Sequence, residues 1–383
     1  MRGDQYGTLT RARLEFVDLM EPKESYRHGG DPQSDLSRLG LPERPIIDFS
    51  VNLNPLGPPA VIRNHWSDVV EGIESYPTPL GEAVARYYQI KYGIATDCFL
   101  PGNGSTEMIY LLPRALGLKK IVVAVPSYHD YTRASILAGA EVILYRLGFN
   151  PTSLWAKTEG IASLLKDAEA VWLGNPNNPT GTLLPKGTLV ELAERFPEKW
   201  IIVDEAFMDF VEEREEASLV QTRSRPNILV IHSLTKFYAL AGVRLGGVVG
   251  HPLAVSRIQA AKEPWTVNGM AEKMAPLLLK CADYDQKTRE MIKQERIRVH
   301  HALGALRGIT AYLSAANFIL CRWHRTDDLD DLLQHLLSQG LYVRDCRNFP
   351  GLDGNYFRLA VRSAAENDQL LESIASISHA PRG

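Results

Sequence analysis

Short runs of consecutive apolar residues recur through the middle of the chain, between about residues 80 and 250, and helix-like stretches separate them. Runs without apolar–polar alternation are typical of strands that are buried on both faces of a sheet. Because strands and helices alternate, the pattern predicts crossover connections and a mostly parallel sheet. The expected strands lie at residues 121–125, 170–173, 200–203, 228–231 and 243–249.

The last third of the chain has a different pattern. A long polar stretch with helical periodicity covers about residues 270–305, and fewer apolar runs follow it, at 317–321, 341–343 and 356–361. The first 45 residues are polar and rich in Arg, Asp, Glu and Pro, which indicates an arm rather than a core. The expected division is an N-terminal arm at 1–50, a large α/β domain at 51–275 and a small C-terminal α+β domain at 276–383.

Composition and charge exclude several classes of protein. The chain has 383 residues, of which 45% are apolar and 23% charged, which is ordinary globular usage. The 42 basic residues are balanced by 45 acidic ones, so no basic excess points to nucleic acid. Four scattered cysteines without a CxxC pair indicate a reducing compartment and no metal site of the structural zinc type. With no secretory signal and no apolar run of ~18 residues, we expect a cytoplasmic enzyme without a membrane partner.

Polar groups follow three of the expected strands directly. Asp204-Glu205 follows one apolar run, His232-Ser233-Leu234-Thr235-Lys236 follows another, and a turn sequence at 174–181 follows a third. Taken singly, each has an ordinary structural explanation: a carboxylate caps a helix, a lysine is solvated, and Asn-Pro-Thr-Gly forms a turn. Together they place an acid, a lysine and an amide at the strand ends where open parallel sheets bind their ligands.

A candidate anion site lies at the start of a predicted helix that runs to about Leu116. Gly102-Asn103-Gly104-Ser105-Thr106 supplies glycines and hydroxyls there. The free N–H groups and the positive dipole end of a helix favour a phosphate, although an ordinary Ser/Thr cap would have the same sequence. Arg244, eight residues after Lys236, could hold the same phosphate. A phosphate site, an amine and a buried carboxylate suit a phosphorylated aldehyde that forms a Schiff base with lysine.

The chain resembles the fold-type-I pyridoxal-phosphate enzymes of the aminotransferase superfamily. The shared motifs, in the order and spacing of that superfamily, are Asn178-Pro179-Thr180-Gly181, Asp204-Glu205-Ala206, Ser233-Leu234-Thr235-Lys236 and Arg244-Leu245-Gly246. Within it the chain is similar to histidinol-phosphate aminotransferases and more closely to the threonine-phosphate decarboxylases of cobalamin biosynthesis. The closer features include His28-Gly29-Gly30, Asp48 to Gly57, Asn348-Phe349-Pro350-Gly351-Leu352-Asp353 and Arg358 to Asn367. The resemblance covers about residues 26–375.

This resemblance implies an aminotransferase-like fold and a role for each matching residue toward pyridoxal 5′-phosphate. Lys236 would bond to the cofactor and move protons, and Asp204 would pair with the protonated ring nitrogen. Tyr128 would stack on the ring, and a core tyrosine is the less favoured alternative. Tyr76 would reach the cofactor phosphate of a neighbouring subunit, which implies a homodimer with shared sites. The remaining cofactor-binding residues implied are Gly104, Ser105, Thr106, Asn178, Ser233 and Arg244.

The implied substrate is a small phosphorylated amino acid. Arg358 would bind its α-carboxylate through the guanidinium fork. Arg344 would bind its phosphate. The other residues implied around the substrate are His28, Gly29, Asn52 and Asn178. Without the resemblance, His28-Gly29-Gly30 would be interpreted as the tip of an arm.

Phe207 is a departure from the aminotransferases, which usually have tyrosine there as a donor to the ring oxygen. It matches the decarboxylases and argues against plain transamination. The choice of reaction comes from the closer resemblance to the decarboxylases, which implies decarboxylation of L-threonine O-3-phosphate. The alternatives are a histidinol-phosphate aminotransferase, a decarboxylase of O-phosphoserine or of a phosphono-amino acid, and a non-catalytic cofactor-binding regulator. The intact Lys236 and phosphate site disfavour the regulator.

Overall fold

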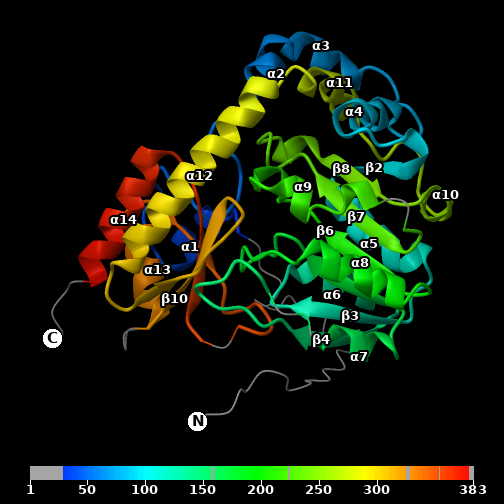
Figure 1. Cartoon of the computed structure of the whole chain (residues 1–383). Helices are drawn as coiled ribbons and strands as arrows, with labels where there is room; N and C mark the ends of the chain where they lie inside the picture. Colours follow the sequence, from blue (N-terminus) through cyan, green and yellow to red (C-terminus); the bar gives the residue numbers. More distant parts are fainter. Residues whose placement is uncertain are drawn as a thin grey trace.

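The structure is a computed structural model of the whole chain and describes residues 29–156, 158, 160–222, 225–324, 328–352 and 354–378. Its elements form a seven-stranded sheet, a four-stranded sheet and a separate pair of strands, with helices around them (Figure 1). No helix among these residues is both long and apolar enough to cross a membrane.

The larger sheet has seven strands in the order β2-β8-β7-β6-β5-β3-β4. Strand β8 is antiparallel to both of its neighbours, and the other pairs from β7 to β4 are parallel. All five predicted strands are present, and β2 and β4 are added at the two edges. The bounds are β2 (Phe99–Asn103), β3 (Lys120–Val125), β4 (Glu141–Arg146), β5 (Ala170–Gly174), β6 (Trp200–Asp204), β7 (Ile228–Ser233) and β8 (Leu245–Val249).

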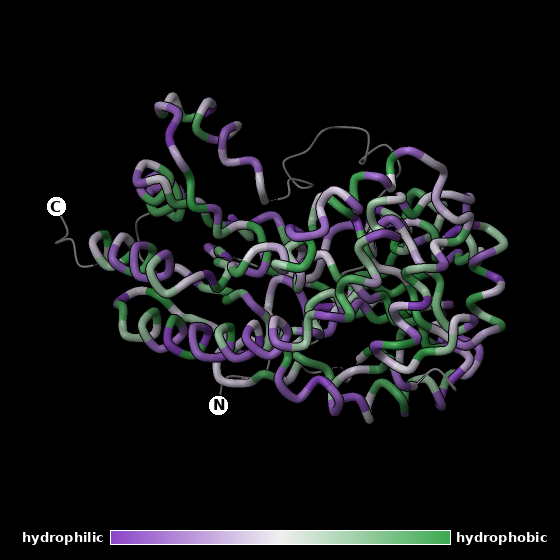
Figure 2. Tube along the Cα trace, turned by 90° about the horizontal axis from the view of Figure 1, so that it is seen from above, coloured by the Kyte–Doolittle hydropathy of each residue, from purple (hydrophilic) through white to green (hydrophobic). Residues whose placement is uncertain are grey.

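Helices cover both faces of this sheet, so its strands are buried on both sides as the continuous apolar runs predict. Alternate residues of each strand enter different clusters: Val203 lies in one core and Ile202 in the other. Figure 2 shows the hydrophobic stretches gathered in the interior of this part of the molecule. One face is covered by α5 (Ser105–Ala115), α6 (His129–Leu137) and α10 (Pro252–Gln259). The other is covered by α4 (Glu82–Tyr92), α7 (Ile161–Leu165), α8 (Lys186–Arg195) and α11 (Gly269–Leu278).

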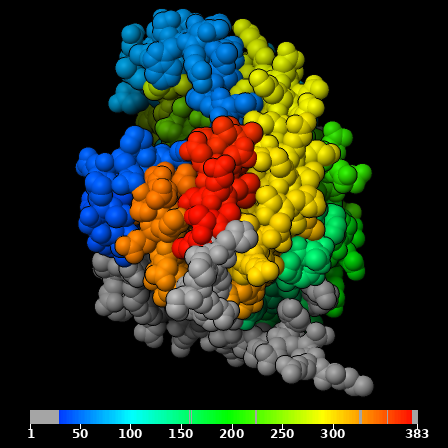
Figure 3. All heavy atoms as spheres, turned by 90° about the vertical axis from the view of Figure 1, so that its left-hand side faces the viewer, coloured from blue at the N-terminus to red at the C-terminus, as the bar shows by residue number. Residues whose placement is uncertain are grey.

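The smaller sheet is antiparallel, with the order β12-β13-β10-β9. A separate parallel pair joins β1 near the start of the described chain to β11 near its end. Figure 3 shows α14 lying between α12 and α13 on this side of the molecule. The bounds are β1 (Ile47–Asp48), β9 (Ile309–Ala311), β10 (Phe318–Trp323), β11 (Leu341–Tyr342), β12 (Arg344–Asp345), β13 (Tyr356–Ala360), α12 (Ala282–Gly304), α13 (Leu329–Ser338) and α14 (Ala364–Ser378).

The helical stretch expected at about 270–305 is two helices, α11 and α12, and not one. The first contains Pro276, whose missing N–H and ring weaken the helix, and it ends at Leu278. The second begins at Ala282 and runs toward the smaller sheet (Figure 1). Because α11 packs against α4, we propose that the large domain extends to the end of α11.

The remaining helices are short. They lie before, between and after the elements above. Their bounds are α1 (Pro32–Arg38), α2 (Ala60–Asn64), α3 (Trp66–Val70), α9 (Arg214–Ala217), η3 (Glu71–Ile73), η4 (Thr96–Cys98), η5 (Met208–Phe210), η6 (Val220–Thr222) and η7 (Ala241–Val243). Within the segment expected to be an arm, α1 buries Leu36 and the residue after β1, Phe49, is fully buried.

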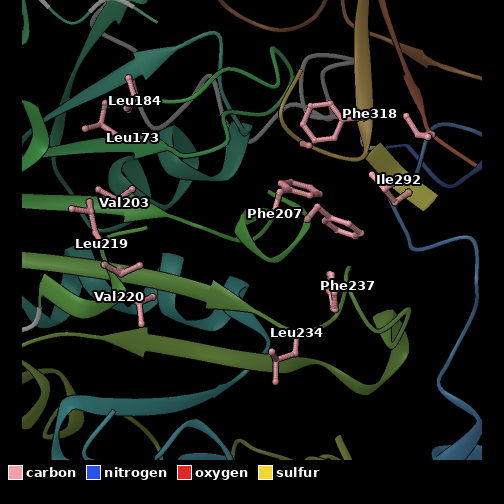
Figure 4. Close-up of a cluster of buried hydrophobic side chains, with 14 of the residues drawn as sticks. Leu173, Leu184, Val203, Phe207, Leu219, Val220, Leu234, Phe237, Ile292 and Phe318 are labelled. Carbon is pink, nitrogen blue, oxygen red and sulfur yellow. The ribbon is translucent and has the colours of Figure 1, made fainter. Parts of the chain in front are cut away.

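A hydrophobic cluster joins the two sheets. Phe207 follows β6 of the larger sheet, and its ring meets that of Phe318 in β10 edge to face, with ring centroids 5.0 Å apart. Figure 4 shows these two rings close together, with Ile292 of α12 in the same cluster. Edge-to-face aromatic pairs add about 0.5–1.5 kcal/mol beyond the area that they bury. The cluster therefore fixes the smaller sheet against the strand that carries Asp204.

Gly247 in β8 provides a test of how tightly the central strands are packed. A Cβ atom there would lie 2.4 Å from the Leu100 carbonyl oxygen and 2.5 Å from the Phe99 ring. We expect Gly247→Ala to lower the free energy of unfolding by about 1–3 kcal/mol, the scale of overpacking. Gly187→Ala is the matched control, because a Cβ atom there meets nothing within 4 Å and alanine favours helix. Urea unfolding of the two variants should separate them, and equal midpoints would contradict the packing.

Candidate active site

One cavity lies where the carboxyl ends of β5, β6 and β7 face the smaller sheet. It also receives the first turns of α5 and α6. Eleven of the fifteen residues predicted for the site line it. These are Gly29, Asn52, Ser105, Thr106, Tyr128, Asn178, Asp204, Lys236, Arg244, Arg344 and Arg358.

Four predicted residues are not among those lining the cavity. Gly104 adjoins it as the N-cap of α5. Ser233 is buried in β7, where its Oγ lies 2.9 Å from Thr235 Oγ1. Tyr76 is 84% exposed, with its ring 5.5 Å from that of Trp265. His28 lies outside the described residues.

The predicted phosphate site is formed by the first turn of α5 and by Arg244. The Arg244 guanidinium donates to Thr106 Oγ1 at 3.1 Å and to the Ala241 carbonyl at 3.2 Å. Gly104 has φ +77°, and a Cβ atom there would lie 2.8 Å from Arg244 Nη2. Only glycine therefore allows the guanidinium to approach the free N–H groups of the helix. The arrangement can bind a phosphate dianion.

Asp204 ends β6 as a buried carboxylate with two hydrogen bonds. Its Oδ2 accepts from the Tyr131 hydroxyl at 2.7 Å and its Oδ1 accepts from the Ala206 N–H at 2.9 Å. Burial raises the pKa of Asp204, whereas these two donors and the charge of Lys236 lower it. A desolvated carboxylate of this kind gains most from a cationic partner in the cavity, such as a protonated ring nitrogen.

Tyr131 is a site residue that the sequence interpretation missed. Its ring is stacked on the indole of Trp172, with centroids 5.1 Å apart and an interplanar angle of 1°. The stack fixes the phenol whose hydroxyl bonds to Asp204. The sequence contained one signal for it. Tyr131 lies three residues after Tyr128, almost one helical turn further along α6, so the two tyrosines share one side of that helix. Tyr128 itself lines the cavity at the N-cap of that helix.

Lys236 lies just beyond the end of β7 with its amine in the cavity. Burial, together with the nearby charges of Arg244 and Arg358, lowers the pKa of Lys236 to about 8, whereas the charge of Asp204 opposes the shift. A substantial fraction of the amine is therefore neutral near pH 8. A neutral, buried amine can attack a carbonyl group.

Arg358 in β13 is held between two parts of the chain. It donates to Asn178 Oδ1, and its Nη2 donates to the Ser50 carbonyl at 2.6 Å. Its buried Nε has no hydrogen-bond partner among the described residues. Burial lowers the pKa of Arg358 to about 10, to which the neighbouring charge of Arg344 contributes. A buried guanidinium with an unused donor is suited to bind a carboxylate.

Arg344 in β12 is the cross-strand partner of Arg358. Its guanidinium donates to Asn348 Oδ1 at 3.0 Å and to the Asp345 carbonyl at 2.5 Å. It also lies over the ring of Phe349, 5.2 Å from the centroid. The arginine is thus oriented before any ligand binds. Asn52 lines the same cavity, and its buried Oδ1 has no hydrogen-bond partner in the described chain.

These residues fit pyridoxal 5′-phosphate, the cofactor predicted from the sequence. The α5 turn and Arg244 would hold its phosphate, Asp204 its ring nitrogen, and Lys236 its aldehyde carbon. Phe207 lines the cavity at the position where aminotransferases usually have tyrosine, so it supplies no hydroxyl there. The two arginines of β12 and β13 remain available for a substrate.

Comparison with known proteins agrees with this fit. Residues 44–374 match the family described as "Aminotransferase class I and II". The chain is 35% identical to threonine-phosphate decarboxylase of Salmonella typhimurium over 358 residues, which cover 91% of this chain and 96% of that protein. It is 30% identical to a histidinol-phosphate aminotransferase of Desulfitobacterium hafniense, over 94% of this chain and 99% of that protein.

Among solved structures, the histidinol-phosphate aminotransferase of Clostridium acetobutylicum is similar, with a TM-score of 0.80 and 29% identity over 86% of this chain and 98% of that one. The fold and the family match together assign both the architecture and the cofactor. The chain belongs to the class I and II aminotransferase family, and its cofactor is pyridoxal 5′-phosphate.

Proposed function

We propose that the protein decarboxylates L-threonine O-3-phosphate to (R)-1-amino-2-propanol O-2-phosphate and CO₂, for the nucleotide loop of cobalamin. The observation that carries this proposal is the pair of arginines on adjacent strands, Arg344 and Arg358, beside the buried Asn52 amide. Two cations on the substrate side suit an amino acid with two anionic groups, a carboxylate and a phosphate. The 35% identity to a threonine-phosphate decarboxylase supports the same substrate.

The chain's own residues would orient the substrate and move its protons. The bound cofactor supplies an electron sink for the bond that breaks at Cα. That bond must stand perpendicular to the cofactor ring, so the position of the α-carboxylate determines whether CO₂ or a proton is lost. Arg358, fixed by Asn178 and by the Ser50 carbonyl, would set that position. Lys236 would return a proton to Cα after CO₂ has left.

We further propose a cytoplasmic homodimer. In this arrangement Tyr76 would reach the cofactor phosphate of the neighbouring subunit. Its exposure of 84% and its packing on the half-exposed Trp265 are consistent with an aromatic surface available to a partner.

A histidinol-phosphate aminotransferase is the second candidate, because such enzymes are also similar to this chain. Histidinol phosphate has a phosphate but no carboxylate, so it would use only one of the two arginines. Phe207 also disfavours this candidate, because it removes a hydroxyl that aminotransferases usually have.

The deciding experiment follows both reactions on one substrate panel. The panel holds L-threonine O-3-phosphate, O-phospho-L-serine, histidinol phosphate and L-threonine. We expect CO₂ release from threonine phosphate and little keto-acid-dependent amine transfer. The discrimination against phosphoserine should be modest, since one methyl group is worth only about 1–3 kcal/mol. Amine transfer from histidinol phosphate, with no CO₂ release from threonine phosphate, would refute the proposal.

The lowered pKa of Lys236 predicts how the apo-protein captures its cofactor. Only the neutral amine reacts with an aldehyde, so the capture rate should rise with pH to a midpoint near the Lys236 pKa of about 8 and then level off. Arg358→Ala removes a neighbouring cation and should move this midpoint to higher pH. Arg362→Ala is the control, because Arg362 pairs with Glu366 and does not line the cavity. Absorbance after rapid mixing with pyridoxal 5′-phosphate measures the rates, and a wild-type midpoint near 10.5 would contradict the assignment.

The two arginines should differ in what they recognise. Arg344→Ala should lower kcat/KM for threonine phosphate. The loss should correspond to about 2–4 kcal/mol of transition-state stabilisation, the scale for removing one partner of a desolvated charge pair. It should cost L-threonine much less, because L-threonine has no phosphate. Arg358→Ala should penalise both substrates alike through their shared carboxylate. Arg347→Ala, a partly exposed cation paired with Asp330 and Asp345, serves as control. Equal losses on both substrates for Arg344→Ala would show that Arg344 does not bind the phosphate.

A further inference from the structure

Ser50 connects three parts of the candidate site, and it has no role in the assignments above beyond its carbonyl. It is 1% exposed and lines the cavity. Its Oγ accepts the Gly30 N–H at 2.8 Å, and its carbonyl accepts Arg358 Nη2 at 2.6 Å. The hydroxyl therefore holds the first described residues, Gly29 and Gly30, while the carbonyl holds the arginine proposed to bind the α-carboxylate.

The backbone of Ser50 is fixed independently of its hydroxyl. Its N–H donates to Asp48 Oδ1 at 2.7 Å. The preceding residue, Phe49, donates to the Tyr342 carbonyl at 2.7 Å and accepts from the Ala360 N–H at 2.8 Å. These bonds join the segment of Ser50 to β13, which carries Arg358, and to β11, which ends two residues before Arg344. Removal of the hydroxyl alone should leave the backbone and its bond to Arg358 in place.

The two glycines allow the chain to approach Ser50 closely. A Cβ atom on Gly29 would lie 2.6 Å from Ser50 Oγ and 2.8 Å from its carbonyl oxygen. Gly30 has φ +91°, a conformation that residues with a side chain rarely adopt. Gly29 also lines the cavity, so it presents backbone rather than a side chain to the ligand. Glycine is the residue that permits such close approach of backbone to a ligand.

The Gly30–Ser50 hydrogen bond spans twenty residues, so it is not part of a local turn. It joins a segment at the cavity edge to a residue mounted on the smaller sheet. A purely structural hydroxyl would contribute to stability alone. A hydroxyl that sets the cavity edge would instead change the affinity for the substrate group bound at that edge.

We propose that the Ser50 hydroxyl is a positioning group for the substrate phosphate. It holds Gly29 and Gly30 at the edge of the cavity that contains Arg344, so that this backbone completes the phosphate site. This inference rests on the proposed function. Ser50 would orient both anion sites, the phosphate site through its hydroxyl and the carboxylate site through its carbonyl.

The test is Ser50→Ala in the holoenzyme, with Kd measured from the change in cofactor absorbance on rapid mixing, before the substrate is turned over. Loss of a neutral hydrogen bond, and of the cavity edge that it orders, should weaken the binding of threonine phosphate about 10-fold, within the range of a single bond of this kind. The Kd for L-threonine should change less than about 2-fold. Ser135→Ala is the control, because it removes an equally buried hydroxyl that bonds only to Tyr131 O within α6. Thermal unfolding of the apo-proteins monitors stability independently of activity.

Equal weakening of the phosphorylated and unphosphorylated ligands, or no weakening of either, would overturn the positioning role. Gly29→Ala is a second variant, since its Cβ atom would displace the Ser50 hydroxyl, and it should show the same selective loss. Failure of the proposed function is recognised separately in the wild type. If the wild type prefers histidinol phosphate, the same comparison uses histidinol phosphate against histidinol, and a selective loss in Ser50→Ala still supports the positioning role.

Discussion

The excess of buried positive charge in the cavity is the constraint on which the rest of the site depends. Lys236, Arg244, Arg344 and Arg358 line it, and Asp204 is the one carboxylate among the described lining residues. Cations removed from water are costly unless anions compensate them. This explains why the pKa values of Lys236 and Arg358 are both lowered. It also explains why the site suits ligands with phosphate and carboxylate groups, which supply the missing negative charge.

The charges can be held in place because apolar contacts join the two sheets that carry them. Lys236 follows β7 and Arg244 precedes β8, both in the larger sheet. Arg344 and Arg358 lie in strands of the smaller sheet. Phe207 and Phe318 meet between the sheets, and Arg358 lies over the Phe318 ring, 5.2 Å from its centroid. Phe207 thus packs between the two sheets, and it also differs from tyrosine in bringing no hydroxyl to the cavity. Its identity affects both the geometry between the sheets and the chemistry of the cavity.

Local patterns in the sequence predicted the larger sheet well. Runs such as 121–125 and 200–203 are strands because burial on both faces leaves no alternation, and that signal is contained in each run. The strand ends that carry Asp204 and Lys236 also follow from the sequence, since parallel strands bring their carboxyl ends to one edge. The role of each residue came from the family resemblance, and the structure shows only that most of them share one cavity.

Contacts between distant segments could not be predicted in this way. The pairing of β1 with β11 and the bond between Tyr131 and Asp204 depend on tertiary packing, which leaves no periodicity in either segment. The interruption between α11 and α12 was missed, although two signals of it were visible in the sequence: Pro276, and the change from the apolar residues of α11 to the polar residues of α12.

The pairing of β1 with β11 has a consequence for the order in which the chain can fold during synthesis. All seven strands of the larger sheet are complete once Val249 has been made, and with them the groups proposed to hold the cofactor. Phe49 and Asn52, on either side of Ser50, lie early in the chain, yet they bond to residues made much later: Phe49 to Tyr342 and Ala360, and Asn52 to Asn317. Contacts so far apart in sequence form slowly because a long loop must close first. A nascent chain can therefore form the cofactor side of the cavity well before the residues that complete the substrate side have been synthesised. Substrate binding is thus expected to develop only after the C-terminal strands are made.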